Sequence, residues 1–369
     1  MTSEHKSAIE SFGLRKIKSE VTLDFMPAYS ALHFGVVYGR EYHEDPLFRI
    51  EQDRHRQRQL FERFGRFGLG CSDPEPVIGV GIQPLDFLNH VLGGRFEFRP
   101  NESVWTPDKP LSHIETVDDV RGLGDVDWET HPDFAELFRQ VAVLKEHFPD
   151  LPVSSIQGVH RDGAKGDRSL LTMHTPCTTA FRLLGERILE LMMLEEDVAR
   201  AVFSYIMRQY RNLWDAICCR TGWQGRKIHF GDCAATMMSP QLFERFCLPM
   251  YMDLMKEFDA GLIHSCGPSS GLLELFARVP KISQLQLGYG TDLGEARALF
   301  PQASILAYYS PAVFLSADPG WIRDDLRRMA NELEHDFLIA GADTDPDTPT
   351  SNLHAYLETA REINEAVAG

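Results

Sequence analysis

The chain has 369 residues, a formal net charge of −17 at pH 7, and 43% hydrophobic residues. This length and composition suffice for one large core, so we expect a single domain over residues 1–369. The acidic balance argues against nucleic acid or an anionic membrane as a partner, because both require a basic surface. No apolar stretch reaches the roughly 18 residues of a membrane span and no signal-peptide core is present, so we expect a cytoplasmic protein.

The first part of the chain, about residues 1–70, is predicted to be an N-terminal extension near the mouth of the domain. It is rich in aromatic residues, and its basic run 54–58 is interleaved with acids, which indicates a solvated helix face. Further along, residues 186–219 carry apolar side chains at helical spacing and predict one long outer helix. The seven scattered cysteines indicate reduced thiols and no disulfide framework.

The second half of the chain repeats a pattern of short apolar strands and amphipathic helices. The predicted strands are residues 227–231, 260–265, 283–288, 304–309 and 337–340, and the predicted helices are residues 241–258, 292–300, 319–333 and 351–367. This alternation predicts an α/β fold with parallel strands and helices on the sheet faces. About 200 residues of it favour a closed (β/α)8 TIM barrel from residue 75 onward, with an open parallel sheet as the alternative.

His264 and Cys266 leave the end of one predicted strand together, two positions apart. Zinc binds both imidazole and thiolate ligands, and in a barrel the carboxyl ends of the strands are where chemistry collects. The alternative is a core-edge histidine beside a buried free thiol. We therefore expect these two residues to share a metal site.

Four further residues are candidate functional residues because they lie at the ends of predicted strands. Asp232 follows residues 227–231, His174 follows residues 169–173, His160 follows residues 156–159, and Tyr308 lies near the end of residues 304–309. Asp232 is a candidate general base or a residue that orients a metal ligand, with a helix cap as the alternative. His174 is a candidate catalytic residue, with a satisfied core histidine as the alternative. His160, before the predicted loop 161–167, and Tyr308 are candidates for substrate contact. The glycine pairs at 79–81 and 288–290 complete no dinucleotide-binding fingerprint.

Several segments occur in a familiar order: residues 230–240, Leu248-Pro249, the His264-Ser-Cys266-Gly267 stretch, and the closing turn 340–352. In this order they resemble the uroporphyrinogen decarboxylase superfamily over about residues 75–365. The resemblance implies the TIM barrel independently of the strand count. True uroporphyrinogen decarboxylases carry an arginine-rich N-terminal motif and a Ser-Asp-Ile-type turn, whereas residues 24–30 here contain no paired arginines and the turn at 80–84 differs. Uroporphyrinogen carries eight carboxylates, and arginine side chains are the groups that bind carboxylates in pairs of hydrogen bonds. The missing arginines are therefore also a physical objection to uroporphyrinogen as the substrate.

The chain looks more similar to the corrinoid-linked methyltransferase branch, in which a His-x-Cys pair and a distant cysteine hold zinc. That resemblance implies His264 and Cys266 as ligands, but Ala342 stands where the branch has its third cysteine. Asp343 is the expected substitute; Asp345, an approach by Cys233 from the preceding strand, or the absence of a tight zinc site are the alternatives.

The resulting hypothesis is a zinc-dependent methyltransferase. It would move a methyl group between a small methylated compound, a corrinoid on a partner protein, and a thiol or tetrahydrofolate acceptor. Two alternatives stay open: a metal-free decarboxylase or lyase acting on a small acid, and a non-catalytic barrel that binds a tetrapyrrole or corrinoid.

Overall fold

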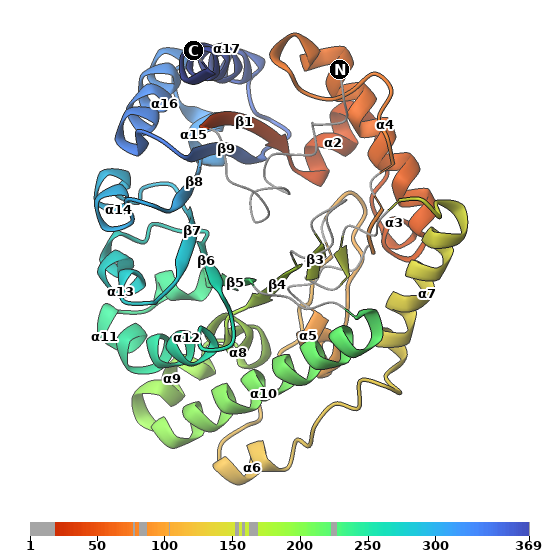
Figure 1. The fold of residues 1–369 in the computed structure, drawn as a ribbon, viewed down its shortest axis with the longest axis vertical. Coiled ribbons are helices and arrows are strands. Elements are labelled where there is room, and N and C mark those ends of the chain that lie inside the picture. The colour runs from red at the N-terminus through yellow and green to blue at the C-terminus, as the bar shows by residue number, and fades with distance from the viewer. Residues whose placement is uncertain are drawn as a thin grey trace.

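The protein, seen in a computed structural model, is a curled β-sheet with helices wrapped around its outer side (Figure 1). The structure describes residues 19–76, 78–80, 87–102, 104–151, 155–156, 159–161, 169–222 and 227–368. The turn 80–84 and the loop 161–167, both used in the sequence analysis, lie largely outside these described residues.

The described strands form one sheet of nine, in the order β1-β9-β8-β7-β6-β5-β4-β3-β2. Their bounds are β1 Glu20–Phe25, β2 Ser155–Ile156, β3 Val159–Arg161, β4 Ser169–His174, β5 Lys227–Gly231, β6 Ala260–Ser265, β7 Ile282–Leu287, β8 Ser304–Tyr308 and β9 Phe337–Thr344. Seven strands, from β1 through β9 to β4, are parallel, whereas β2, β3 and β4 pair antiparallel. The carboxyl ends of the parallel strands therefore meet along one edge.

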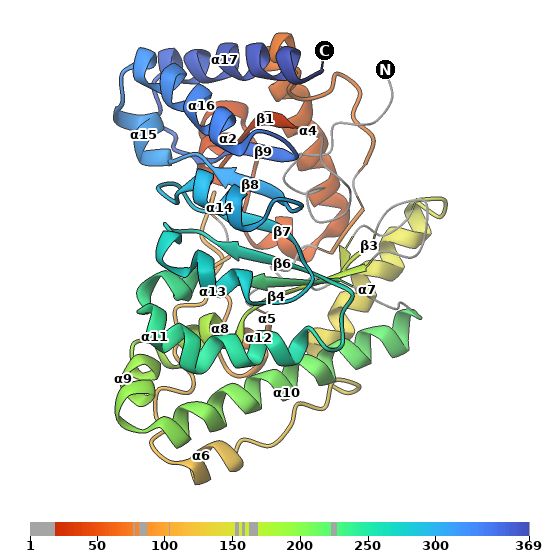
Figure 2. The same cartoon turned by 60° about the vertical axis from the view of Figure 1, so that its left-hand side comes forward.

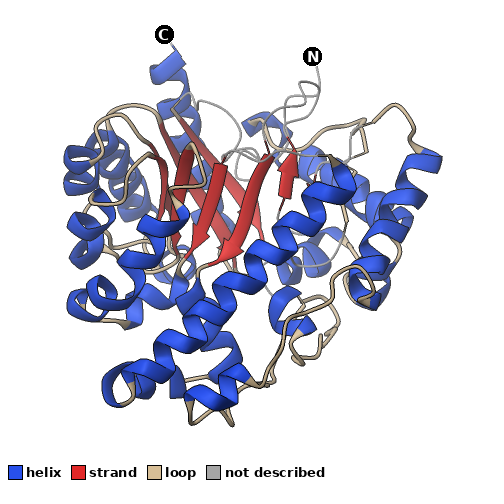
Figure 3. Ribbon diagram, turned by 60° about the horizontal axis from the view of Figure 1, so that its bottom comes forward, coloured by secondary structure: helices blue, strands red, loops and turns tan. Residues whose placement is uncertain are grey.

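The α/β class with a parallel sheet is confirmed, and the closed eight-stranded barrel stays a prediction. Among the described residues, β1 and β2 are the two edges and no pairing joins them, so Figure 3 shows a curled, open sheet. On the β2 side the expected strand–helix repeat is replaced by antiparallel pairing. Only residues 162–168 connect β3 to β4, which is shorter than the crossover that a parallel pair requires.

The described helices have the bounds α2 Pro27–Phe34, α3 Arg40–Glu44, α4 Pro46–Phe64, α5 Phe87–Val91, α6 Val117–Arg121, α7 Pro132–His147, α8 Pro176–Leu184, α9 Arg187–Leu194, α10 Glu196–Thr221, α11 Pro240–Leu242, α12 Leu248–Leu254, α13 Leu273–Ala277, α14 Leu293–Leu299, α15 Pro311–Ser316, α16 Pro319–Leu333 and α17 Thr350–Ala368. In Figure 2 the helices of the second half follow the outer side of the sheet. Within the described part of the chain, no helix combines the length and apolar character of a membrane crossing.

The two faces of the sheet differ in character because side chains alternate along each strand. The outward positions join the main core beneath the helices, and they include Phe230, Ile263, Leu285, Ile305, Phe337 and Ile339. On the inner face, Leu262, Leu306 and Leu338 form a separate small core. The next inward position on β6 is His264, and Gln286 pairs with it from β7. Polar groups therefore replace apolar ones toward the carboxyl ends.

One helix prediction needs correction, and part of the N-terminal segment belongs to the sheet. The single helix over 186–219 is wrong, because Glu195 takes a non-helical conformation and separates α9 from α10. Apolar spacing is helical on both sides, so periodicity alone could not locate the break; the acidic Glu196 and Asp197 mark the new N-terminus. At the other end, residues 20–25 of the expected extension form strand β1 beside β9.

The helix predicted over 241–258 consists of α11, the π-helical turn η5 (Phe243–Cys247) and α12. Pro249 has no backbone N–H, so the carbonyl of Arg245 loses its helical partner. The guanidinium of Arg200, from α10, donates to that carbonyl at 3.4 Å. The irregular helix delivers Tyr251, which is fully buried, to the back of the site described next.

Candidate metal centre

Cys233, His264 and Cys266 come together at the carboxyl ends of β5 and β6. The Sγ atoms of Cys233 and Cys266 lie 2.7 Å apart, and Nε2 of His264 lies 2.9 Å from Sγ of Cys266. Both cysteines are free, and the three ligand atoms all lie within 4.8 Å of one another. Tetrahedral zinc with bonds of about 2.0–2.3 Å holds its ligand atoms roughly 3.5–3.8 Å apart, so these side chains would move apart by about 1 Å around an ion. Two sulfurs with one imidazole nitrogen form a donor set that zinc prefers.

The carboxyl ends of β5 and β6 lie side by side because the two strands are parallel neighbours, with Gly231 opposite His264. Beyond the last pair, the backbone N–H of Asp232 donates to the carbonyl of His264 at 2.7 Å. This bond extends the ladder by one residue and holds the chain that carries Cys233 against the strand that carries the other two ligands.

The imidazole of His264 is oriented by Gln286 on β7. Nδ1 of His264 lies 2.8 Å from Oε1 of Gln286, and the hydroxyl of Tyr308 donates to the same oxygen at 3.3 Å. An amide oxygen only accepts hydrogen bonds, so Nδ1 carries the proton and Nε2 keeps its lone pair toward Cys266. Tyr308 also packs edge-on against the imidazole, with 5.6 Å between ring centroids.

The two thiols share one proton. The Cys266 thiol hydrogen-bonds to the Cys233 sulfur and, against desolvation, lowers the pKa of Cys233 to about 3. The neighbouring Cys233 sulfur and burial raise the pKa of Cys266. The pair is therefore held as one thiolate and one thiol near neutral pH, and a bound cation would favour loss of the remaining proton.

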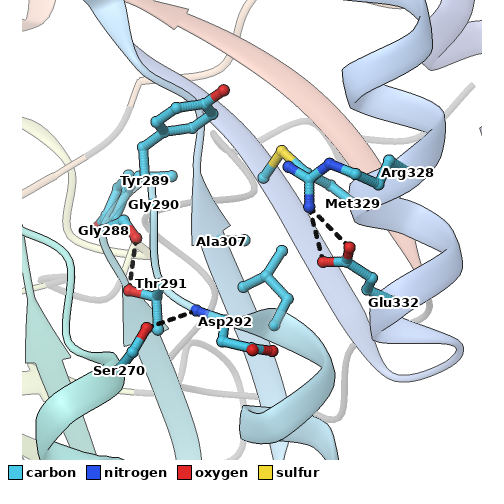
Figure 4. A pocket seen from close by; sticks show the side chains of 12 residues that line it. Ser270, Gly288, Tyr289, Gly290, Thr291, Asp292, Ala307, Arg328, Met329 and Glu332 are labelled. Atoms are coloured by element: carbon cyan, nitrogen blue, oxygen red, sulfur yellow. Dashed lines mark hydrogen bonds and ion pairs between the residues drawn. The ribbon is translucent and has the colours of Figure 1, made fainter.

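Gly288, which follows β7, packs directly on the loop that carries Cys266. A Cβ at this position would overlap the backbone carbonyls of Cys266 and Gly267. Glycine is therefore required here by the close approach of two backbones. On the other side of this contact, a cavity of about 500 Å³ extends between the β7–α14 loop and α16 (Figure 4). Its polar groups pair with one another: Asp292 N donates to Ser270 Oγ at 2.8 Å, and Arg328 pairs with Glu332.

The structure brings together only part of the predicted site. His264 and Cys266 meet as expected, and Cys233, which the sequence offered as an alternative, is the third member of the group that could hold a metal ion. Asp343 lies outside this group of ligand atoms, although its charge acts on Cys266. Desolvation raises the pKa of Asp343, and the nearby Asp24 carboxylate adds to the shift. A ligand role for Asp343 stays a prediction.

The remaining candidates lie around the cluster. His174 ends β4, is buried, and its charge acts on Cys233. Tyr308 lies beside His264, and burial raises the pKa of its hydroxyl. His160 lies in β3, and its side chain is outside the described residues. Asp345 accepts a hydrogen bond from the backbone of Asp347 and contacts none of the cluster in the described structure. The catalytic and substrate-binding roles stay predictions.

Asp232 is fully buried, and its carboxylate accepts hydrogen bonds from Thr178 Oγ1 at 3.0 Å and from the Tyr251 hydroxyl. It precedes the 3₁₀ turn η4 (Cys233–Met237) without capping it through its side chain, so the alternative of a helix cap does not describe it. Burial raises the pKa of this carboxyl, against the effect of its hydrogen-bond donors.

Gln286 and Gly288 were missed as site residues. The signal for Gln286 was an alternation of Gln284 and Gln286 with leucines in a buried strand, which marks a polar inner face. The signal for Gly288 was its place as the last residue of the predicted strand 283–288.

Comparison with known proteins gives the same family as the sequence motifs. A family model described as uroporphyrinogen decarboxylase (URO-D) matches residues 169–363. Curated uroporphyrinogen decarboxylases from Trichormus variabilis and from a Nostoc species are each 29% identical over 333 residues, covering 84% of this chain and 89% of the relative. A solved methyltransferase from Methanosarcina mazei superposes with a TM-score of 0.55 over 96% of both chains. At 16% identity, this last likeness shows a shared fold.

Proposed function

The chain belongs to the uroporphyrinogen decarboxylase family, and from this premise we propose that it is a zinc-dependent methyltransferase. The observation that carries the proposal is the convergence of Cys233, His264 and Cys266 at the strand ends. Decarboxylation of a polycarboxylate substrate does not require two thiols and an imidazole whose ligand atoms lie within 4.8 Å of one another. A methyltransferase that activates a thiol does.

The three side chains fit zinc by donor type, by proximity and by orientation. Zinc, when bound, would keep a thiol substrate deprotonated near neutral pH and so make it a nucleophile. Gln286 keeps the Nε2 lone pair of His264 available, and the low pKa of Cys233 supplies one thiolate before any ion arrives.

The transfer itself balances as a displacement. The acceptor sulfur forms a bond to the methyl carbon while the bond between that carbon and the donor atom breaks, and the donor atom keeps the electron pair. The proton of the acceptor thiol must go to a base, and we assign this role to His174 at the end of β4. Tyr308 offers a rim hydroxyl to the substrate.

The methyl donor is proposed to be a small methylated compound or a corrinoid on a partner protein, and the acceptor a thiol or tetrahydrofolate. The shared fold with a methyltransferase from Methanosarcina mazei supports this branch. The second candidate is a metal-free decarboxylase or lyase acting on a small acid, which the names of the curated relatives favour.

The two functions separate in one experiment. Protein purified without a histidine tag is loaded with zinc or stripped with a chelator, then assayed with methylcobalamin as donor and simple thiols as acceptors. The proposal predicts methyl transfer that requires zinc and disappears in Cys266→Ala, while the exposed Cys71→Ala behaves as the wild type. Methyl transfer that survives both chelation and Cys266→Ala would contradict the zinc-thiolate mechanism, and loss of CO₂ from a small acid without any methyl transfer would favour the metal-free enzyme.

A further inference from the structure

Asp232 is a buried carboxylate with no opening to the inner face, so it is unsuited to act on substrate. Its side chain is fully buried between the sheet and the helices, where it meets α8 and α12. Burying a charged group is costly unless hydrogen bonds compensate, so the arrangement around it calls for a structural explanation.

The explanation lies in the residues on both sides of Cys233. Before it, Asp232 donates its backbone N–H to the carbonyl of His264 and accepts two side-chain hydrogen bonds. After it, the backbone N–H of Ala234 donates to Thr178 Oγ1 at 3.0 Å, and the same hydroxyl donates to Asp232. Cys233 is thus the residue between two anchored neighbours.

The anchors themselves are rigid. Tyr251 is fully buried and its ring stacks on Phe230, with centroids 4.4 Å apart and planes 10° from parallel. Thr178 is buried in the first turns of α8. A side chain held by packed groups transmits its position to the residue beside it, which is how supporting residues fix metal ligands.

We propose that Asp232 is a positioning residue that, through Thr178 and Tyr251, holds Cys233 in place as the third metal ligand. The role of Cys233 as a zinc ligand rests on the proposed function. The placement of Cys233 beside Cys266 by Asp232 does not depend on a metal.

The matched control is Asp325. Among the described residues it is the other buried aspartate that accepts a hydrogen bond from a tyrosine hydroxyl. It accepts from Tyr289 at 2.8 Å and pairs with Arg328, and none of these contacts involves Cys233, His264 or Cys266. Asp325→Asn therefore perturbs a similar buried group whose partners make none of the contacts that hold Cys233, so it serves as the reference for a general loss of stability.

The first measurement uses zinc affinity, obtained by competition with a chromophoric chelator. Asp232→Asn is expected to weaken zinc binding by roughly 10- to 100-fold, the usual effect of removing a supporting partner. Tyr251→Phe removes one hydrogen bond to Asp232, and Thr178→Val removes the bond to Asp232 and the bond from Ala234 N. Both variants are expected to weaken zinc binding, each by less than Asp232→Asn. Asp325→Asn is expected to bind zinc as the wild type does. Equal affinities for Asp232→Asn and Asp325→Asn would overturn the proposal.

The second measurement needs no metal. Diamide, a mild oxidant that is itself reduced to the hydrazine, joins two adjacent thiols, and peptide mass spectrometry reports the Cys233–Cys266 disulfide. The rate of disulfide formation is expected to fall about tenfold in Asp232→Asn and Tyr251→Phe and to stay unchanged in Asp325→Asn. When Cys233 is no longer held beside Cys266, the effective concentration of one thiol at the other falls. Unchanged rates in both site variants would overturn the positioning role even if wild-type protein binds zinc. Slower oxidation in a protein that binds no zinc would leave the positioning role standing and sink the proposed function.

Discussion

Nδ1 of His264 lies 2.8 Å from Oε1 of Gln286, so a residue of one strand determines which nitrogen of its neighbour can bind a metal. The two residues are direct partners in the β6–β7 ladder, and the sheet register alone brings them together. The first prediction follows from this pair.

Gln286→Leu removes the acceptor and leaves the imidazole free to rotate and to change tautomer. We expect zinc affinity to fall by roughly 10- to 100-fold, as for other partners of metal-bound histidines. Gln286→Glu retains an acceptor at the same place and should stay near the wild-type affinity. Chelator competition measures the zinc affinity of both variants. If Gln286→Leu binds zinc as tightly as the wild type, Gln286 does not orient the His264 imidazole for metal binding.

Gly288→Ala is expected to displace the Cys266 loop, because the added methyl group overlaps the carbonyls of Cys266 and Gly267. The variant should lose zinc and melt at a lower temperature than the wild type. The control is Gly271→Ala in the neighbouring turn, where a Cβ would meet only Pro240 at 4.0 Å. Calorimetry with metal analysis tests the pair, and identical behaviour of the two variants would contradict the close packing.

Cys233 and Asp343 are the two candidates for the third zinc ligand, and alanine variants of the two residues distinguish them. Cys233→Ala should release most of the zinc, whereas Asp343→Ala should retain about one zinc per chain, since only the first removes one of the grouped ligand atoms. Metal analysis after dialysis distinguishes them. The reverse pattern would restore Asp343 as the ligand and leave Cys233 as a neighbour.

The shared proton of the cysteine pair predicts a pH dependence for the metal-free, reduced protein. In the folded state the pKa of Cys233 is lowered to about 3 and that of Cys266 is raised, whereas unfolded thiols titrate at about 8.5. Below about pH 8.5 the unfolded state binds more protons than the folded state, so the stabilisation by the cysteine pair grows as pH rises. Above about pH 8.5 the folded state binds more protons, so the stabilisation declines as pH rises further.

The difference in Tm between the wild type and Cys266→Ala, measured from about pH 6 to 10 with chelator and reductant, should therefore peak near pH 8.5. A difference that is flat across this range would mean that the two thiols titrate independently.

The sequence predicted the strands that carry the site well. Residues 227–231 and 260–265 are strands with the predicted bounds, because short apolar runs between helix signals leave little choice. The meeting of His264 and Cys266 followed from their positions on one strand. The presence of Cys233 in this group, and the position of Asp343 outside it, could not be predicted. They depend on the conformations of two loops from different strands, which spacing along the chain does not encode.

The fully buried position of Asp232 was equally hidden. Its position after a strand indicated a rim residue, but its side chain turns away to Thr178 and Tyr251, which come from distant helices. Only the packing of α8 and α12 against the sheet determines that direction. The antiparallel β2–β3–β4 pairing likewise depends on a short connection that periodicity does not reveal.

X-ray absorption at the zinc edge of protein loaded with one equivalent of zinc tests the central claim most directly. The account predicts about one bound zinc per chain with two sulfur neighbours near 2.3 Å and a histidine nitrogen near 2.0–2.1 Å, and one sulfur fewer in Cys233→Ala. A protein that retains no zinc after loading, or a zinc ion surrounded by oxygen and nitrogen alone, would contradict it.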